Sequence, residues 1–247
     1  MKTVSFVTTV IAALAMAVLP AKATQTFLGT GNVNGSGAVD GAGISSLVVN
    51  NDANNITFTI NSTQAQASYI FYSIELQIIG QAGSGDTSLV NPWGENVGIS
   101  TGENAVVNTW GTGATPGTFS GGIWTMGAGG SYVAGGTGST FATMTVPLSS
   151  LGLVVGNSFY VDVVSSYASP GGQSAYGALD NTSWPAETDN SYQPWLGSNH
   201  YDSATDAGGT IFGTAATLYT VVPEPTACAL LGLGSLLMFI RRRMFSR

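Results

Sequence analysis

The chain has 247 residues, and its 13 acidic and six basic residues give a formal net charge of −7. All six Lys and Arg lie in the first 22 or the last seven residues, so the 199 residues from Thr24 to Val222 contain 12 acids and no Lys or Arg. Such a body has no cationic patch for phosphates, which excludes nucleic-acid binding, and it has no Lys or Arg for salt bridges.

The N-terminus, residues 1–23, has the pattern of a secretory signal peptide. Lys2 supplies the positive charge, an apolar stretch runs from Val4 to Leu19, and Ala21-Lys22-Ala23 is a small-x-small cleavage triplet. The alternative is a single N-terminal transmembrane helix, but the helix-breaking Pro20 and the small residues favour cleavage after Ala23. We therefore expect an exported protein.

Alternation of apolar and polar residues predicts β-strands throughout the body, residues 24–221. In the stretch 55–61, Ile56, Phe58 and Ile60 alternate with threonines. Further strands are predicted in 69–79, 140–148, 159–164 and 217–222, with one helical turn at 148–153. Thirty-two of the 34 glycines lie in the body, and the two densest stretches, 29–43 and 126–140, are predicted to be loops. The pattern favours an all-β fold with a single antiparallel β-sandwich over disordered linkers.

The body contains few residues suited to catalysis. It has one histidine, His200, and the only cysteine of the chain, Cys228, lies in the C-terminal tail, so a disulfide within the chain is excluded. We predict no catalytic residue. Glu75 and Asp162 lie on predicted strands and would be available as a carboxylate pair for glycoside hydrolysis, but solvated acids are the favoured interpretation.

Aromatic residues among acids and amides indicate a sugar-binding surface. A tryptophan in a loop offers a flat apolar face for a sugar ring, and neighbouring carboxylates and amides can bond its hydroxyl groups. The alternative is that these rings close the ends of the sandwich. The predicted stacking residues are Trp93, Trp184, Tyr192, Trp195 and Tyr201.

The same acidic stretch is a candidate calcium site, because calcium is bound by several carboxylate and carbonyl oxygens. The spacing of an EF-hand is absent, and solvated acids are again the alternative. No other cofactor is expected. The candidate ligands are Asp180, Asp189, Asp202 and Asp206.

The C-terminal segment 222–247 combines three elements in order. Val222-Pro223-Glu224-Pro225 is followed by the uncharged run 226–240 and by Arg241, Arg242 and Arg243. As a helix these 15 residues span ~22 Å, less than the ~30 Å hydrocarbon core, so they form a short membrane helix helped by the arginines. Arginines on the cytoplasmic side place the body outside the cell.

This order of elements resembles the PEP-CTERM sorting signal of exported bacterial proteins. The resemblance implies that an exosortase, a membrane protease-transpeptidase, processes the tail. The body is then released or attached at the cell surface, commonly where exopolysaccharide is made. The tail is thus expected to be a sorting signal rather than a permanent membrane anchor. Pro223 and Pro225 keep this segment extended, so that it can enter the substrate-binding groove of the processing enzyme.

A second, shorter resemblance lies in the body. VPLSSLGLVVGNSFYVDVVSSY and AYGALDN are similar to the late strands of carbohydrate-binding sandwiches of the DOMON and family 9 kind. This resemblance implies a jelly-roll-like β-sandwich rather than a barrel for the body. From these features we expect a non-catalytic cell-surface or matrix protein that binds exopolysaccharide. The alternatives are a purely structural acidic matrix protein and a secreted glycoside hydrolase.

Overall fold

The structure is a computed structural model that describes residues 24–31, 41–81, 85–94, 97–110, 113–169, 172–179, 201–202 and 216–223. The predicted signal peptide and everything from Glu224 onward lie outside these residues. No helix in the described part of the chain is long and apolar enough to cross a membrane.

The described residues form short and medium-length strands and one 3₁₀ turn. In chain order these are β1 Gln25–Leu28, β2 Ile44–Asn51, β3 Asn55–Ser62, β4 Ile70–Ile78, β5 Val97–Gly98, β6 Ala105–Trp110, β7 Gly113–Ser120, β8 Ile123–Met126, β9 Gly130–Gly135, β10 Phe141–Pro147, η1 Leu148–Leu151, β11 Ser158–Ser169, β12 Gly172–Ala178, β13 Tyr201–Asp202 and β14 Leu218–Thr220. The predicted strands and the predicted helical turn are confirmed.

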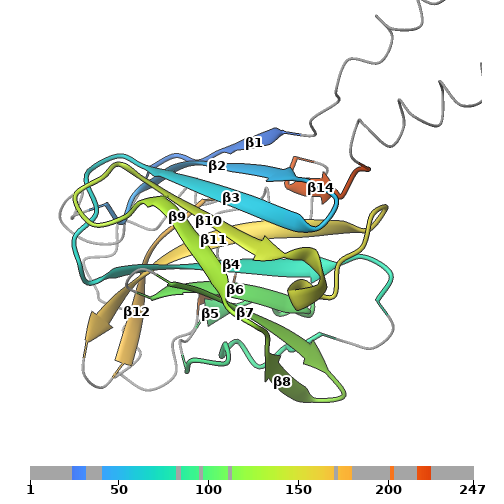
Figure 1. The fold of residues 1–247 in the computed structure, drawn as a ribbon. Coiled ribbons are helices and arrows are strands. Elements are labelled where there is room, and N and C mark those ends of the chain that lie inside the picture. Colours follow the sequence, from blue (N-terminus) through green and yellow to red (C-terminus); the bar gives the residue numbers. More distant parts are fainter. Residues whose placement is uncertain are drawn as a thin grey trace, which may run out of the picture.

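Twelve of these strands are hydrogen-bonded into one antiparallel sheet, in the order β1-β2-β3-β10-β9-β7-β6-β4-β11-β12. On its flanks β14 pairs with β11, and β8 pairs with β7. The sheet curls strongly, so that β1, β2 and β3 lie above β4, β6 and β7 in Figure 1, with β9 and β10 between the two levels. The expected antiparallel all-β architecture is confirmed, as one curled sheet; the two-sheet jelly-roll-like sandwich stays a prediction.

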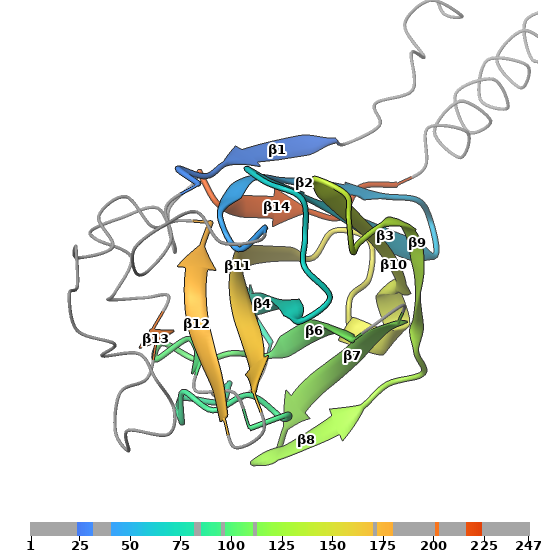
Figure 2. The ribbon, with the colours of Figure 1, turned by 90° about the vertical axis from the view of Figure 1, so that its left-hand side faces the viewer.

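One hydrophobic core fills the space enclosed by the curled sheet (Figure 2). Strand β3 alternates strictly, and its Ile56, Phe58 and Ile60 are fully buried, as predicted. From the other half of the sheet, Phe159 and Val161 of β11 enter the same cluster. Removing these apolar side chains from water is the main stabilising contribution to the fold.

The prediction of a loop at 126–140 is wrong for residues 130–135, which form strand β9 in the middle of the sheet. The glycines there allow close approach. A Cβ at Gly130 would overlap Val146, and one at Gly135, where φ is +85°, would overlap the carbonyl of Phe141. Glycine therefore marks close strand contacts here rather than a break in the sheet.

The two ends of the body meet at the end of β2. Gln25 of β1 pairs with Val49, and the side chain of Asn51, two residues further on, bonds the backbone of Val222. The mature N-terminus predicted at Thr24 and the first residues of the predicted sorting motif thus leave the body at the same place.

Candidate functional site

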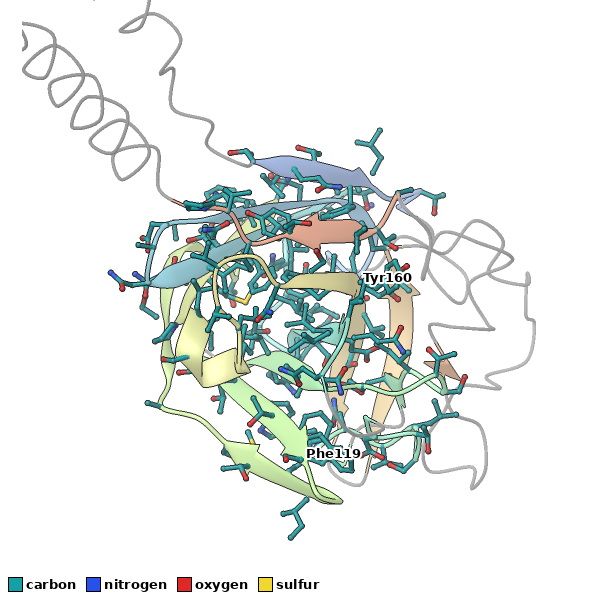
Figure 3. All side chains as sticks on the ribbon, turned by 90° about the vertical axis from the view of Figure 1, so that its right-hand side faces the viewer. Phe119 and Tyr160 are labelled. Atoms are coloured by element: carbon teal, nitrogen blue, oxygen red, sulfur yellow. The ribbon has the colours of Figure 1, made fainter. Side chains whose placement is uncertain are left out.

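The outward face of β11, β4, β6 and β7 carries the candidate site. The strand register aligns residues into rows across this face, and the first row runs from Tyr160 through Gln77 and Asn104 to Phe119. The amide of Phe119 donates to the carbonyl of Asn104 at 2.8 Å, which fixes the last step. Three strand spacings of about 4.8 Å make this row roughly 14 Å long. Figure 3 labels its aromatic ends, Tyr160 beside β11 and Phe119 on the β7–β8 hairpin.

A shallow groove of about 240 Å³ lies along the middle of this row. Its lining is mainly polar, with amide and hydroxyl groups from Gln77, Gln81, Thr101 and Asn104. The amide nitrogen of Gln77 donates to the carbonyl and the hydroxyl oxygen of Thr101, at 2.8 and 3.0 Å. These bonds hold the 85–104 segment against β4 and set the width of the groove.

An aromatic ledge stands at one end of the groove, on the β7–β8 hairpin. Phe119 and Trp124 are cross-strand partners whose ring centroids lie 5.3 Å apart at 58°. The indole nitrogen of Trp124 donates to Asp86 at 2.7 Å, and Asp86 is bonded through its backbone to Glu103. The ledge is therefore held in place by Asp86, which belongs to the segment 85–104. This segment lies over the outward face of the sheet and is called the covering segment below. Trp124 was not among the predicted stacking residues, although Gly121-Gly122 just before it is a signal for a hairpin turn.

In the next row along the strands, Glu75 of β4 and Asp162 of β11 are direct cross-strand partners on the same outward face. Both side chains are 0% exposed. The expectation that they are solvated acids is wrong, because residues of 85–94 and 97–104 lie over this face, where Asn91 bonds Ser73 and Thr101 bonds Gln77. Alternation along a strand predicts which face a residue occupies, but not whether a second layer covers that face.

The third row is also polar and buried. Ser73, the next outward residue of β4, pairs with Asn108 of β6, and the amide of Asn91 in the covering segment donates to the Ser73 hydroxyl at 3.4 Å. Asn108 is 4% exposed, and its side-chain oxygen has no hydrogen-bond partner among the described residues. A buried carbonyl oxygen in this condition is uncommon and calls for an explanation.

Of the predicted stacking residues, Trp93 lies in the covering segment, where its backbone N–H donates to the side chain of Asn91 at 3.1 Å. The backbone of Tyr201 in β13 pairs in parallel with Val97 of β5, so this residue also runs beside the covering segment. The remaining three, Trp184, Tyr192 and Trp195, lie outside the described residues.

The predicted calcium ligands fall almost entirely outside the described residues. Asp202 is described, as the neighbour of Gly98 in the small parallel sheet. Asp180, Asp189, Asp206 and the single histidine, His200, lie outside. Among the described residues, no group of three or more His, Cys, Asp or Glu side chains is placed to hold a metal.

The predicted sorting motif begins where the folded body ends. The Tyr219 hydroxyl donates to the side-chain oxygen of Asn51 at 2.8 Å, and Asn51 in turn donates to the carbonyl of Val222 at 2.8 Å. Burial raises the pKa of Tyr219 to about 12. Pro223 is exposed, and the rest of the motif, from Glu224 on, lies outside the described residues.

Comparisons of the chain with family models, with curated proteins and with solved structures find no match.

Proposed function

We propose that this chain is an exported, non-catalytic cell-surface or matrix protein that binds extracellular polysaccharide through the groove between Tyr160 and Phe119. The observation that carries the proposal is the combination of a fixed aromatic ledge with a row of amide and hydroxyl groups beside it. Aromatic walls with a few placed polar groups are the usual composition of a ligand site.

The shape and charge of this groove favour a glycan over other ligands. It is open and lies along a row of residues about 14 Å long, a length that suits an extended chain better than a single small molecule. Its side chains bear amides and hydroxyls, which bond sugar hydroxyl groups without charge. Because the body has no Lys or Arg, a neutral polysaccharide fits better than an acidic one, which would need bridging cations.

The hydrolase alternative is less well supported. Glu75 and Asp162 are direct cross-strand partners, but both are fully buried beneath the covering segment. A general acid must come within hydrogen-bond reach of the substrate, and a polymer has no access to a covered pair. We therefore assign the pair a role other than hydrolysis.

Delivery to the surface is the second part of the proposal. The C-terminal elements resemble a PEP-CTERM signal, and we propose that an exosortase-type enzyme reads them at the membrane. The bonds of Asn51 anchor the chain up to Val222, so cleavage within the following strip leaves the body intact. We keep the jelly-roll-like sandwich as the fold assignment of the body, supported by the two facing halves of the curled sheet around one core.

The glycan-binding proposal is tested by co-sedimentation of the body, residues 24–222, with exopolysaccharide purified from the producing cells. Trp124→Ala and Phe119→Ala remove the ledge, and we expect each to weaken binding at least tenfold, about 1.4 kcal/mol. Tyr69→Ala is the matched control, because Tyr69 is an exposed aromatic residue just before the opposite end of β4. Equal binding by all three variants would move the site elsewhere, and no binding by the wild type would favour the purely structural alternative.

The sorting proposal is tested by the intact mass of the surface protein from the same cells. We expect a chain that begins at Thr24 and has lost the arginine cluster, and we expect Glu224→Gln to retain the full tail. A wild-type surface protein that still ends at Arg247 would contradict processing.

A further inference from the structure

The buried carboxyl groups of Glu75 and Asp162 present an electrostatic problem. They face one another on neighbouring strands, both fully buried, where two like charges destabilise the pairing. Burying an ionised carboxylate is costly unless an opposite charge compensates it. The body contains no Lys or Arg from residue 24 to residue 222, so no lysine or arginine of the body can compensate this pair.

A second observation indicates what compensates the two carboxyl groups. Asn108 is the diagonal neighbour of Glu75 on the same face, since it pairs with Ser73, two residues along β4. Its side-chain oxygen is buried without a hydrogen-bond partner among the described residues. Diagonal neighbours on a sheet lie about 7 Å apart at their Cα atoms, within reach of one shared ligand. A third oxygen donor is therefore buried beside Glu75, on the side of β4 opposite to Asp162.

We infer that Glu75, Asp162 and Asn108 bind a divalent cation of the calcium class between the sheet and the covering segment. Carboxylate and amide oxygens are the ligands calcium prefers, and calcium tolerates irregular geometry completed by water or by backbone carbonyls. Zinc would want histidine or cysteine, and neither lies among the described residues of this face. The carboxyl group of Asp162 is oriented by a bond from the amide of Val163 at 2.7 Å.

The cation would connect two halves of the site. It would neutralise the pair beneath the 85–104 segment, and this segment also forms one wall of the groove through Thr101. Cation binding would thus stabilise the cover and the groove together. Cation binding does not depend on glycan binding, because it rests on the buried carboxyl pair and the unbonded oxygen of Asn108.

The test uses the full-length chain purified in mild detergent, washed with chelator and titrated with calcium chloride in a calorimeter. Melting temperature is measured in parallel, with calcium or with chelator. We expect one calcium ion per chain, a dissociation constant of about 10⁻⁴ to 10⁻³ M as in other extracellular modules, and a higher melting temperature with calcium. Lowering the pH to about 4 should abolish binding, because protonated carboxyl groups do not bind calcium.

The variant Glu75→Gln/Asp162→Asn should lose the calcium response while folding without it, and Asn108→Ala should lower the affinity. Glu103→Gln is the matched control. Glu103 is also a buried acid, and it lies in the covering segment outside the pair. If the double variant does not fold, Glu75→Gln alone and Asn108→Ala are compared with this control.

Three results would overturn the inference. The first is a wild type without calcium binding or chelator sensitivity. The second is a double variant that binds calcium as well as the wild type, or a control that loses binding, since either places the ion elsewhere. The third is a melting temperature that calcium does not change but that falls as the pH rises from about 5 to about 8. That result would show that Glu75 and Asp162 share a proton instead of binding a cation.

Discussion

Replacing Asn51 by alanine should weaken the attachment of the last strand, which still pairs with β11, and lower the free energy of unfolding by about 2 to 5 kcal/mol. Asn51 is 8% exposed and joins β2 to β14 by three bonds, two with the backbone of Val222 and one from the Tyr219 hydroxyl. The hydroxyl is the largest part of the effect. Tyr219 is 1% exposed, so its O–H would be left buried without an acceptor, which costs about 1 to 3 kcal/mol.

The two bonds to Val222 add the remainder, at about 0.5 to 1 kcal/mol each, since water partly replaces them at this half-buried position. Tyr219→Phe removes only the hydroxyl and should cost about 1 kcal/mol. The assay is urea unfolding of the body, residues 24–222, followed by tryptophan fluorescence. Asn55→Ala is the control, because the amide of Asn55 makes only exposed bonds of 3.3 Å to Asp52. A loss for Asn51→Ala within 0.5 kcal/mol of the control, about the scatter expected of surface substitutions, would refute the reasoning.

Three further predictions concern stability and accessibility. The pKa of Tyr219 is raised to about 12 in the folded protein, so the contribution of its neutral hydroxyl to the free energy of unfolding is complete below pH 10 and is lost as the pH rises to about 12. This loss is about 2 to 3 kcal/mol. It should be missing in Tyr219→Phe when unfolding is measured across that pH range. Gly135→Ala should lower the free energy of unfolding by at least about 2 kcal/mol, because the new Cβ would overlap the carbonyl of Phe141. Gly138→Ala is the control and should cost about 1 kcal/mol, since Gly138 has a similar φ of +82° but open space around it. Equal losses for the two variants in urea unfolding would show that the overlap with Phe141 is relieved. The mature protein taken from the cell surface should resist trypsin even when unfolded in urea, since residues 24–222 contain no Lys or Arg. Tryptic cleavage seen by mass spectrometry would show that a terminal segment with its Lys or Arg is retained and would contradict the assigned boundaries.

The sequence predicted the strands whose two faces differ most in polarity. Ile56, Phe58 and Ile60 alternate with threonines, and β3 is buried on that side as expected. Strand β9 was missed because its residues are glycine-rich, and glycine was read as a loop signal. In the fold it permits close approach to the next strand, β10, and alternation of side chains carries no signal of that backbone contact.

The candidate site could be predicted only in part, for a related reason. The glycan-binding class was inferred from aromatic and amide composition, yet among the described residues the aromatic pair beside the groove is Phe119 and Trp124, which the sequence did not single out. Glu75 and Asp162 were recognised as able to meet, but their burial depends on the 85–104 segment crossing the outward face of the sheet. Neither alternation nor composition within one strand carries that information.

The most direct test of the central claim is hydrogen–deuterium exchange of the body with and without bound exopolysaccharide. The account predicts slower exchange in peptides that cover 77–81, 99–104 and 117–126, which line the groove and its ledge, and no change around Tyr69 at the other end of β4. Protection confined to other strands, or bound polysaccharide that leaves these peptides unchanged, would contradict the assignment of the groove as the glycan-binding site.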